Sequence, residues 1–143
     1  MKYLYTITAT SIMMALLIAC KNNNDNKQTV TLDTKNRTTI QWVDSIKNFG
    51  TIQEGEKVEM VFNFKNTGSQ PFIITQVQPS CGCTIANKPE KPIAPGASGS
   101  VSAVFNSAGK EGMVHKSIQV YGNMANKPFS ELIFEGEVMK KKH

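Results

Sequence analysis

The chain has 143 residues, a formal net charge of +5, a hydrophobic content of 40% and three cysteines. This length allows one domain with a modest hydrophobic core, together with a leader and a connecting segment. Nucleic-acid binding is not expected, because the lysines at the two ends (Lys2, and Lys140 to Lys142) account for most of the net charge of +5 and no basic stripe is interleaved with aromatic residues.

Residues 1–19 form an apolar leader that ends beside a cysteine. Lys2 provides a short positive region, residues 7–18 are mostly apolar, and Leu17-Ile18-Ala19-Cys20 matches the lipobox of bacterial lipoprotein signal peptides. A short transmembrane helix is the alternative, but the apolar run is short for a membrane span and no charged stop-transfer flank follows it. We therefore expect cleavage before Cys20 and a lipid on its thiol, with several acyl chains, since one chain alone anchors weakly.

The residue after Cys20 bears on the destination of the protein. It is Lys21 and not aspartate, which by the sorting rule of enteric bacteria resembles an outer-membrane signal, although other phyla use different rules. We expect a lipid-anchored protein of the cell envelope, at the outer membrane, facing the periplasm or the cell surface. Lipid on Cys20 would leave Cys81 and Cys83 as an even pair in an oxidising compartment.

Residues 20–39 are the predicted tether. After the cysteine they are polar, rich in Asn, Lys and Thr, and almost free of large apolar residues. This composition is typical of disordered segments. About 19 residues reach ~60 Å when fully extended, so the tether would let the following domain work at a distance from the membrane.

Short apolar runs separated by turn residues predict an all-β domain over residues 40–139. Its clearest strand is 57–65, in which Val58, Met60, Phe62 and Phe64 alternate with mostly polar residues. Further strands are expected near residues 40–43, 72–77, 83–86, 101–105, 114–120 and 132–138, while residues 49–52 lead into a turn at 54–56. About seven short strands at this spacing predict an immunoglobulin-like β-sandwich, followed by a basic tail at 140–143.

Two details of this sandwich can be predicted from residue types. Residues 72–77 are apolar on both faces at their start, which suits a central strand. Gly136 lies within the last strand, where glycine often marks a β-bulge.

Short motifs are spread along the predicted domain. They are FGTI at 49–52, EGE at 54–56, FNFKNTG at 62–68, SCGCT at 80–84, IAPG at 93–96, VFN at 104–106, GKEG at 109–112 and FEGEV at 134–138. Together they resemble the DUF1573 family of bacterial proteins, over roughly residues 45–138. The resemblance implies an Ig-like domain of the ASH/MSP/hydin type, often found in lipoproteins or secreted proteins of Bacteroidetes, and implies no particular activity.

The motif Ser80-Cys81-Gly82-Cys83-Thr84 holds both remaining cysteines and is the main candidate site. In an extended segment, residues i and i+2 point to the same face, so both sulfurs would project together. Three arrangements are open: two thiols packed as small apolar groups, a disulfide, or a soft-metal site for Cu(I) or Zn.

Each arrangement makes a demand on the neighbouring residues. A disulfide needs Gly82 to bend the chain, because the Cα atoms of an extended pair lie near the upper limit of ~7 Å. Such a bond would be a weak staple that is easily reduced, which is a redox signature. A zinc site needs about four ligands, and the chain offers only His115 and His143, or Met113 and Met124 for copper.

No other constellation points to chemistry. The acidic residues are scattered singly, and Ser80 has no nucleophile-elbow motif. We therefore expect neither an enzyme nor a cofactor. Asp44-Ser45-Ile46 resembles the O-glycosylation acceptor of Bacteroidetes, or is a chance match.

The lipobox, the tether and the sandwich pattern predict a membrane-anchored binding or scaffolding module. Ig-like sandwiches commonly present loops or edge strands to a partner, here a protein of the cell envelope. The alternative is a thiol redox or copper-handling protein that uses Cys81 and Cys83. Replacing both cysteines with serine separates the two hypotheses, because only the alternative predicts lost function with the fold intact.

Overall fold

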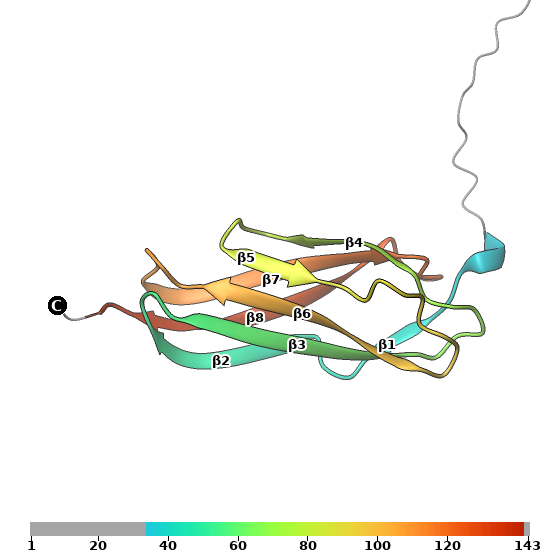
Figure 1. Cartoon of the computed structure of the whole chain (residues 1–143), viewed down its shortest axis with the longest axis horizontal. Coiled ribbons are helices and arrows are strands. Elements are labelled where there is room, and N and C mark those ends of the chain that lie inside the picture. The colour runs from blue at the N-terminus through green and yellow to red at the C-terminus, as the bar shows by residue number, and fades with distance from the viewer. Residues whose placement is uncertain (1–33, 142–143) are drawn as a thin grey trace, which may run out of the picture. The chain divides into compact units, whose positions relative to one another are not determined.

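The computed structural model describes residues 34–141, which form two facing β-sheets (Figure 1). The predicted leader, Cys20, most of the predicted tether and His143 lie outside the described residues. The elements are η1 (Thr34–Asn36), β1 (Ile40–Trp42), β2 (Ile46–Gln53), β3 (Lys57–Asn66), β4 (Ile74–Pro79), β5 (Thr84–Asn87), β6 (Ser98–Asn106), β7 (Gly112–Gly122) and β8 (Phe129–Met139). In this part of the chain, no helix has the length and apolar character needed to cross a membrane.

The two sheets have four strands each. One sheet has the order β1-β3-β6-β5 and the other the order β2-β8-β7-β4. All neighbours are antiparallel except β2 and β8, which run parallel. The predicted all-β, Ig-like sandwich is confirmed, with eight strands in place of about seven.

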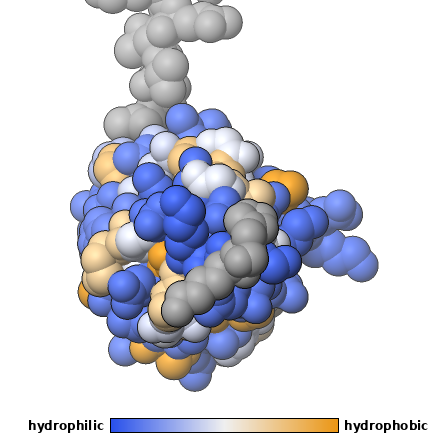
Figure 2. Space-filling model, turned by 90° about the vertical axis from the view of Figure 1, so that its left-hand side faces the viewer, coloured by the Kyte–Doolittle hydropathy of each residue, from blue (hydrophilic) through white to orange (hydrophobic). Residues whose placement is uncertain are grey.

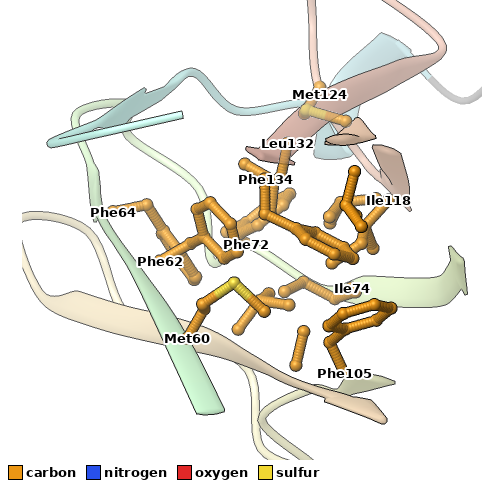
Figure 3. Close-up of a cluster of buried hydrophobic side chains, with 14 of the residues drawn as sticks. Met60, Phe62, Phe64, Phe72, Ile74, Phe105, Ile118, Met124, Leu132 and Phe134 are labelled. Atoms are coloured by element: carbon orange, nitrogen blue, oxygen red, sulfur yellow. The ribbon is translucent and has the colours of Figure 1, made fainter. Parts of the chain in front are cut away.

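The core lies between the two sheets and is built from alternate residues of each strand. On β3 every second residue from Met60 to Asn66 is buried and the residues between them are exposed, as the period-two pattern predicts. Figure 3 shows aromatic and aliphatic side chains from both sheets meeting in one cluster. Its rings pack edge-on or tilted, with Phe64 and Phe72 5.4 Å apart and Phe105 and Phe134 5.6 Å apart between ring centres, which is the preferred geometry of aromatic pairs.

The folded part begins before residue 40, where the predicted tether ends. Thr38 is buried and forms a parallel bridge with Met124. Its backbone nitrogen donates to the Asn123 carbonyl at 2.9 Å, and its side chain donates to Asn66 Oδ1 at 2.8 Å. A polar residue is thus fixed by hydrogen bonds, which hydrophobic patterning does not reveal.

The expectation of a central strand at residues 72–77 is wrong. β4 covers Ile74–Pro79 and lies at the edge of its sheet, with β7 as its one neighbour. The apolar start of the segment precedes the strand: Phe72 is buried and bridges Ile93 in the connection between β5 and β6, whereas Ile73 is 47% exposed. The apolar run therefore reflects a chain that passes between the sheets and not a strand buried on both faces.

The bulge expected at Gly136 lies in the neighbouring strand. β8 pairs with β7 without interruption through Gly136 and Val114. The register shift is in β2, between Asn48 and Thr51, opposite Gly136. Gly136 leaves room for the Phe49 ring that this shift brings over it.

Candidate functional site at the link between the sheets

The Ser80–Thr84 motif is the link that carries the chain from β4 in one sheet to β5 in the other. Hydrogen bonds fix both ends of the link. Ser80 N donates to the Ser117 carbonyl at 2.9 Å, and Ser117 N donates to Ser80 Oγ at 3.1 Å. At the other end, Asn106 N donates to the Cys83 carbonyl at 2.9 Å. The link is therefore held to β7 on one side and to β6 on the other.

Cys81 and Cys83 are joined by a disulfide in the structure. Their Cα atoms are 5.3 Å apart, which is within the range that a disulfide spans. Of the three arrangements open from the sequence, the structure contains this one. The bond closes a loop with a sequence separation of 2, so the chain-entropy model gives it only about 1–2 kcal/mol of stabilisation.

Gly82 does not pack against any other part of the domain. It does not adopt a positive φ, and a Cβ added to it would meet no atom within 4 Å. Neither backbone conformation nor packing within the domain therefore requires glycine here. What glycine provides is an uncovered surface beside the disulfide.

A shallow groove of about 370 Å³ runs beside the disulfide. It is lined by Lys57, Gly82, Cys83, Ile85, Val104, Asn106, Ala108 and Lys110. Register explains how they meet, because Lys57 on β3 pairs with Asn106 on β6, and Val104 pairs with Ile85 on β5. Figure 2 looks at the end of the domain where β2 turns into β3 and β6 into β7, and its surface is mainly hydrophilic with small, separate apolar patches.

The described residues that line this groove include two lysines and no carboxylate. Lys57 and Lys110 are both exposed. The lining of the groove beside the disulfide therefore carries positive charge.

These lysines were missed by the sequence analysis. Lys57 begins the strand predicted at 57–65, and Lys110 lies in the GKEG motif at 109–112; the structure places them at the start of β3 and in the connection between β6 and β7. Their proximity to Cys83 comes from the pairing of β3, β6 and β5, which are far apart in sequence. No local motif carries that information.

The other candidate residues lie apart from the disulfide. His115 Nδ1 is 3.4 Å from Glu135 Oε2 on the outer face of β7. Met113, near the start of β7, is 80% exposed, whereas Met124 beyond its end is buried. These two methionines cannot meet at one copper ion with the cysteines. Between residues 34 and 141, no three His, Cys, Asp or Glu side chains form a group that could hold a metal ion.

The predicted glycosylation motif forms part of the corner between β1 and β2. Asp44 Oδ2 accepts a hydrogen bond from Lys47 Nζ at 2.6 Å, and the Ser45 carbonyl accepts from Ile133 N at 2.8 Å. Ser45 is half-buried. The motif therefore has a structural role at this corner.

Comparison with solved structures places the fold among Ig-like domains. A protein of unknown function from Porphyromonas gingivalis W83 aligns with a TM-score of 0.64 and 16% identity, over 77% of this chain and 51% of that one. The seventh PapD-like domain of human CEP192, an ASH/PapD-like domain, gives 0.56 and 12%, over 74% and 89%. The VesB protease of Vibrio cholerae gives 0.58 and 16%, over 69% and 32%. At these identities the likeness concerns the fold alone, and this chain spans about half the length of the P. gingivalis protein.

The family comparison agrees with the motifs noted in the sequence. No curated protein matches the chain. A family model described as "Protein of unknown function (DUF1573)" matches residues 40–138, which includes every strand from β1 to β7 and nearly all of β8. The chain therefore belongs to the DUF1573 family.

Proposed function

We propose that this protein is a binding or scaffolding module of the cell envelope, anchored to a membrane by lipid on Cys20, and that it contacts a protein partner through the β5 edge and the groove beside it. The observation that supports this most is Ile85. It lies on β5, an edge strand of its sheet, and is 68% exposed beside the groove. Edge strands offer unpaired backbone groups to an extended partner segment.

Crosslinking in the cell envelope tests the contact surface. A photoreactive amino acid at Ile85 should give one discrete crosslinked species in cells that make the full-length protein. The matched control is Ile46, which is 58% exposed on β2, the edge strand at the other side of the fold. The Ile85 product should disappear when Lys57 and Lys110 are changed to glutamate. Equal products from both positions, or none from Ile85, would refute the proposed surface.

Cys20→Ala tests the proposed anchor. The unchanged protein should sediment with membranes and partition into detergent, because acyl chains add about 0.8 kcal/mol per buried CH₂. The variant should lack the mass of the lipid and keep the mass of residues 1–19, because cleavage before Cys20 follows its lipidation; intact mass measures both. Cys81→Ser is the matched control, since it removes a thiol that the proposal does not lipidate. If Cys20→Ala has the same mass as the unchanged protein apart from the substitution, Cys20 carries no lipid and the proposed anchor is wrong.

Thiol–disulfide exchange at Cys81 and Cys83 is the second candidate function. The supporting observation is the disulfide itself, which is only partly buried and lies beside an open groove. Because the bond closes so short a loop, its contribution to stability is small. A conformational staple would close a longer loop, whereas an accessible, weakly stabilising disulfide suits exchange with another thiol.

A further inference from the structure

We propose that the groove beside the disulfide receives a reduced cysteine pair carried on an acidic segment of a partner protein, and that Cys83 is the sulfur attacked. This inference rests on the second candidate function, thiol–disulfide exchange. It adds the direction of attack, the residues that guide it and the chemistry of the partner.

The two sulfurs have different surroundings. Cys83 and Gly82 line the groove, and Gly82 has no side chain to cover the approach. Cys81 Sγ lies 3.6 Å from Thr84 Oγ1, and Thr84 is only 6% exposed. Both cysteines are half-buried, and Cys83 also packs against the core. The groove is therefore the side from which an incoming thiolate would reach Cys83, while Cys81 lies next to a hydroxyl that can donate a hydrogen bond.

This asymmetry matches the needs of the exchange reaction. A partner thiolate attacks Cys83 Sγ and forms a mixed disulfide, and the Cys81–Cys83 bond breaks with its electron pair on Cys81 Sγ. The Thr84 hydroxyl can donate to that leaving thiolate, which then takes a proton from water. The partner's second thiolate then attacks the partner's first sulfur, which is bonded to Cys83 Sγ in the mixed disulfide. This forms the partner's disulfide and releases Cys83 as a thiolate. The partner's dithiol is thus oxidised to a disulfide, and Cys81 and Cys83 are reduced.

The charge of the groove selects the partner. Lys57 is held in place by its pairing with Asn106. The backbone of Lys110 is held by a turn, in which its backbone nitrogen donates to the Ser107 carbonyl at 3.0 Å. Ser107 is fully buried and its Oγ lies 3.0 and 2.8 Å from the carbonyl oxygens of Gln53 and Glu56. Two exposed lysines whose backbone is held beside the attacked sulfur attract a thiolate and the carboxylates that flank it.

The free edge of β5 indicates a polypeptide partner. β5 is the last strand in its sheet and pairs with β6 on one side. The exposed Ile85 lies on that edge, next to the groove. An extended acidic segment can add its backbone to this edge and place its cysteines over Cys83.

Two small dithiols of different charge test the charge selection on the purified full-length protein. Anionic dihydrolipoate stands in for the acidic dithiol, because its two thiols can close a five-membered cyclic disulfide, and dithiothreitol serves as the uncharged reference. At equal thiolate concentration and low salt, we expect the anionic dithiol to reduce the disulfide about tenfold faster, from the Coulomb attraction of two nearby lysines. Lys57→Gln with Lys110→Gln should remove this preference, and about 1 M salt should screen it.

The matched control is Lys65→Gln with Lys127→Gln. It removes the same charge, and Lys65 lies on the same exposed face of β3 at the other end of the strand. This control should keep the preference. If dithiothreitol reduces the disulfide but the anionic dithiol is not preferred, the acidic-partner inference is wrong and thiol exchange stands. If neither dithiol reduces it in the folded protein, thiol exchange itself is wrong.

The direction of attack has its own readout. Brief reaction with glutathione, followed by acid quenching and alkylation of free thiols, traps the mixed disulfide. Fragment-ion mass spectrometry then assigns the two sulfurs, because Gly82 separates them. We expect glutathione on Cys83 and the alkyl group on Cys81, and Thr84→Val should slow trapping without moving the adduct. Glutathione mainly on Cys81 would overturn the assignment.

Discussion

Replacing Gly136 with alanine should lower the free energy of unfolding by about 3 kcal/mol, the upper part of the range for overpacked cores. A Cβ at this position would overlap the Phe49 ring and lie 2.6 Å from the Gly50 carbonyl oxygen. The ring has little freedom to move, because it stacks on Phe105 at 5.7 Å and lies 6.4 Å from Phe134 between ring centres. Denaturant unfolding of the purified domain measures the loss.

Two controls locate this effect at the contact between β2 and β8. Gly82→Ala should change the free energy of unfolding by less than about 0.5 kcal/mol, because its Cβ meets nothing. Combining Gly136→Ala with Phe49→Ala should give less than the sum of the two losses, since the ring that clashes is gone. If Gly136→Ala unfolds at the same denaturant concentration as the unchanged protein, β2 does not pair with β8 in this register.

The same contact explains why one strand was harder to predict than another. β3 alternates apolar and polar residues without interruption, so the period-two pattern predicts both the strand and its buried face. β2 has the shift between Asn48 and Thr51, so its burial pattern loses that period. A bulge is stabilised by what packs across it, here Gly136 from the far end of the sequence, and local patterning cannot reveal this.

The candidate site shows the same division between local and long-range information. The Ser80–Thr84 motif could be singled out from the sequence, because two cysteines around a glycine between predicted strands are unusual. Which side chains surround Cys83 depends on the order of the strands in the sheets. This order was not predicted correctly, because β4 was expected in the centre of a sheet but lies at an edge. That edge position lets the chain leave β4 beside Ser117 of β7 and cross to β5 beside Asn106 of β6. The groove with Lys57 and Lys110 is a product of the crossing.

Replacing Asn66 with alanine should lower the free energy of unfolding by about 3–4 kcal/mol, because buried polar groups left without partners cost about 1–3 kcal/mol each. The Asn66 side chain is fully buried and all its hydrogen-bonding capacity is used. Nδ2 donates to the Gln70 and Ile93 carbonyls at 2.8 and 2.9 Å. Oδ1 accepts from Thr38 Oγ1 at 2.8 Å and from Gly68 N at 3.2 Å.

Two further variants separate the lost hydrogen bonds from lost volume. Asn63→Ala, on the exposed face of the same strand, should change stability by less than about 0.5 kcal/mol. Asn66→Asp keeps the shape but turns a carboxylate oxygen toward two carbonyl oxygens. Burial and these acceptors would raise the pKa of that carboxyl in the folded state, so the variant should regain stability relative to the unchanged protein as the pH falls. Equal losses for Asp and Ala at all pH values would contradict the hydrogen-bond account.

Asn66 and the groove lie at opposite ends of β3, and this separates stability from the proposed chemistry. Asn66 ends the strand and Lys57 begins it, so about 30 Å lies between them. Below its unfolding transition, Asn66→Ala should therefore keep the preference of the disulfide for the anionic dithiol, although it is the less stable protein. Lys57→Gln with Lys110→Gln should do the reverse and lose the preference at nearly unchanged stability. If each variant instead loses both its free energy of unfolding and its preference for the anionic dithiol, the preference depends on the general stability of the fold and not on the charge of the groove.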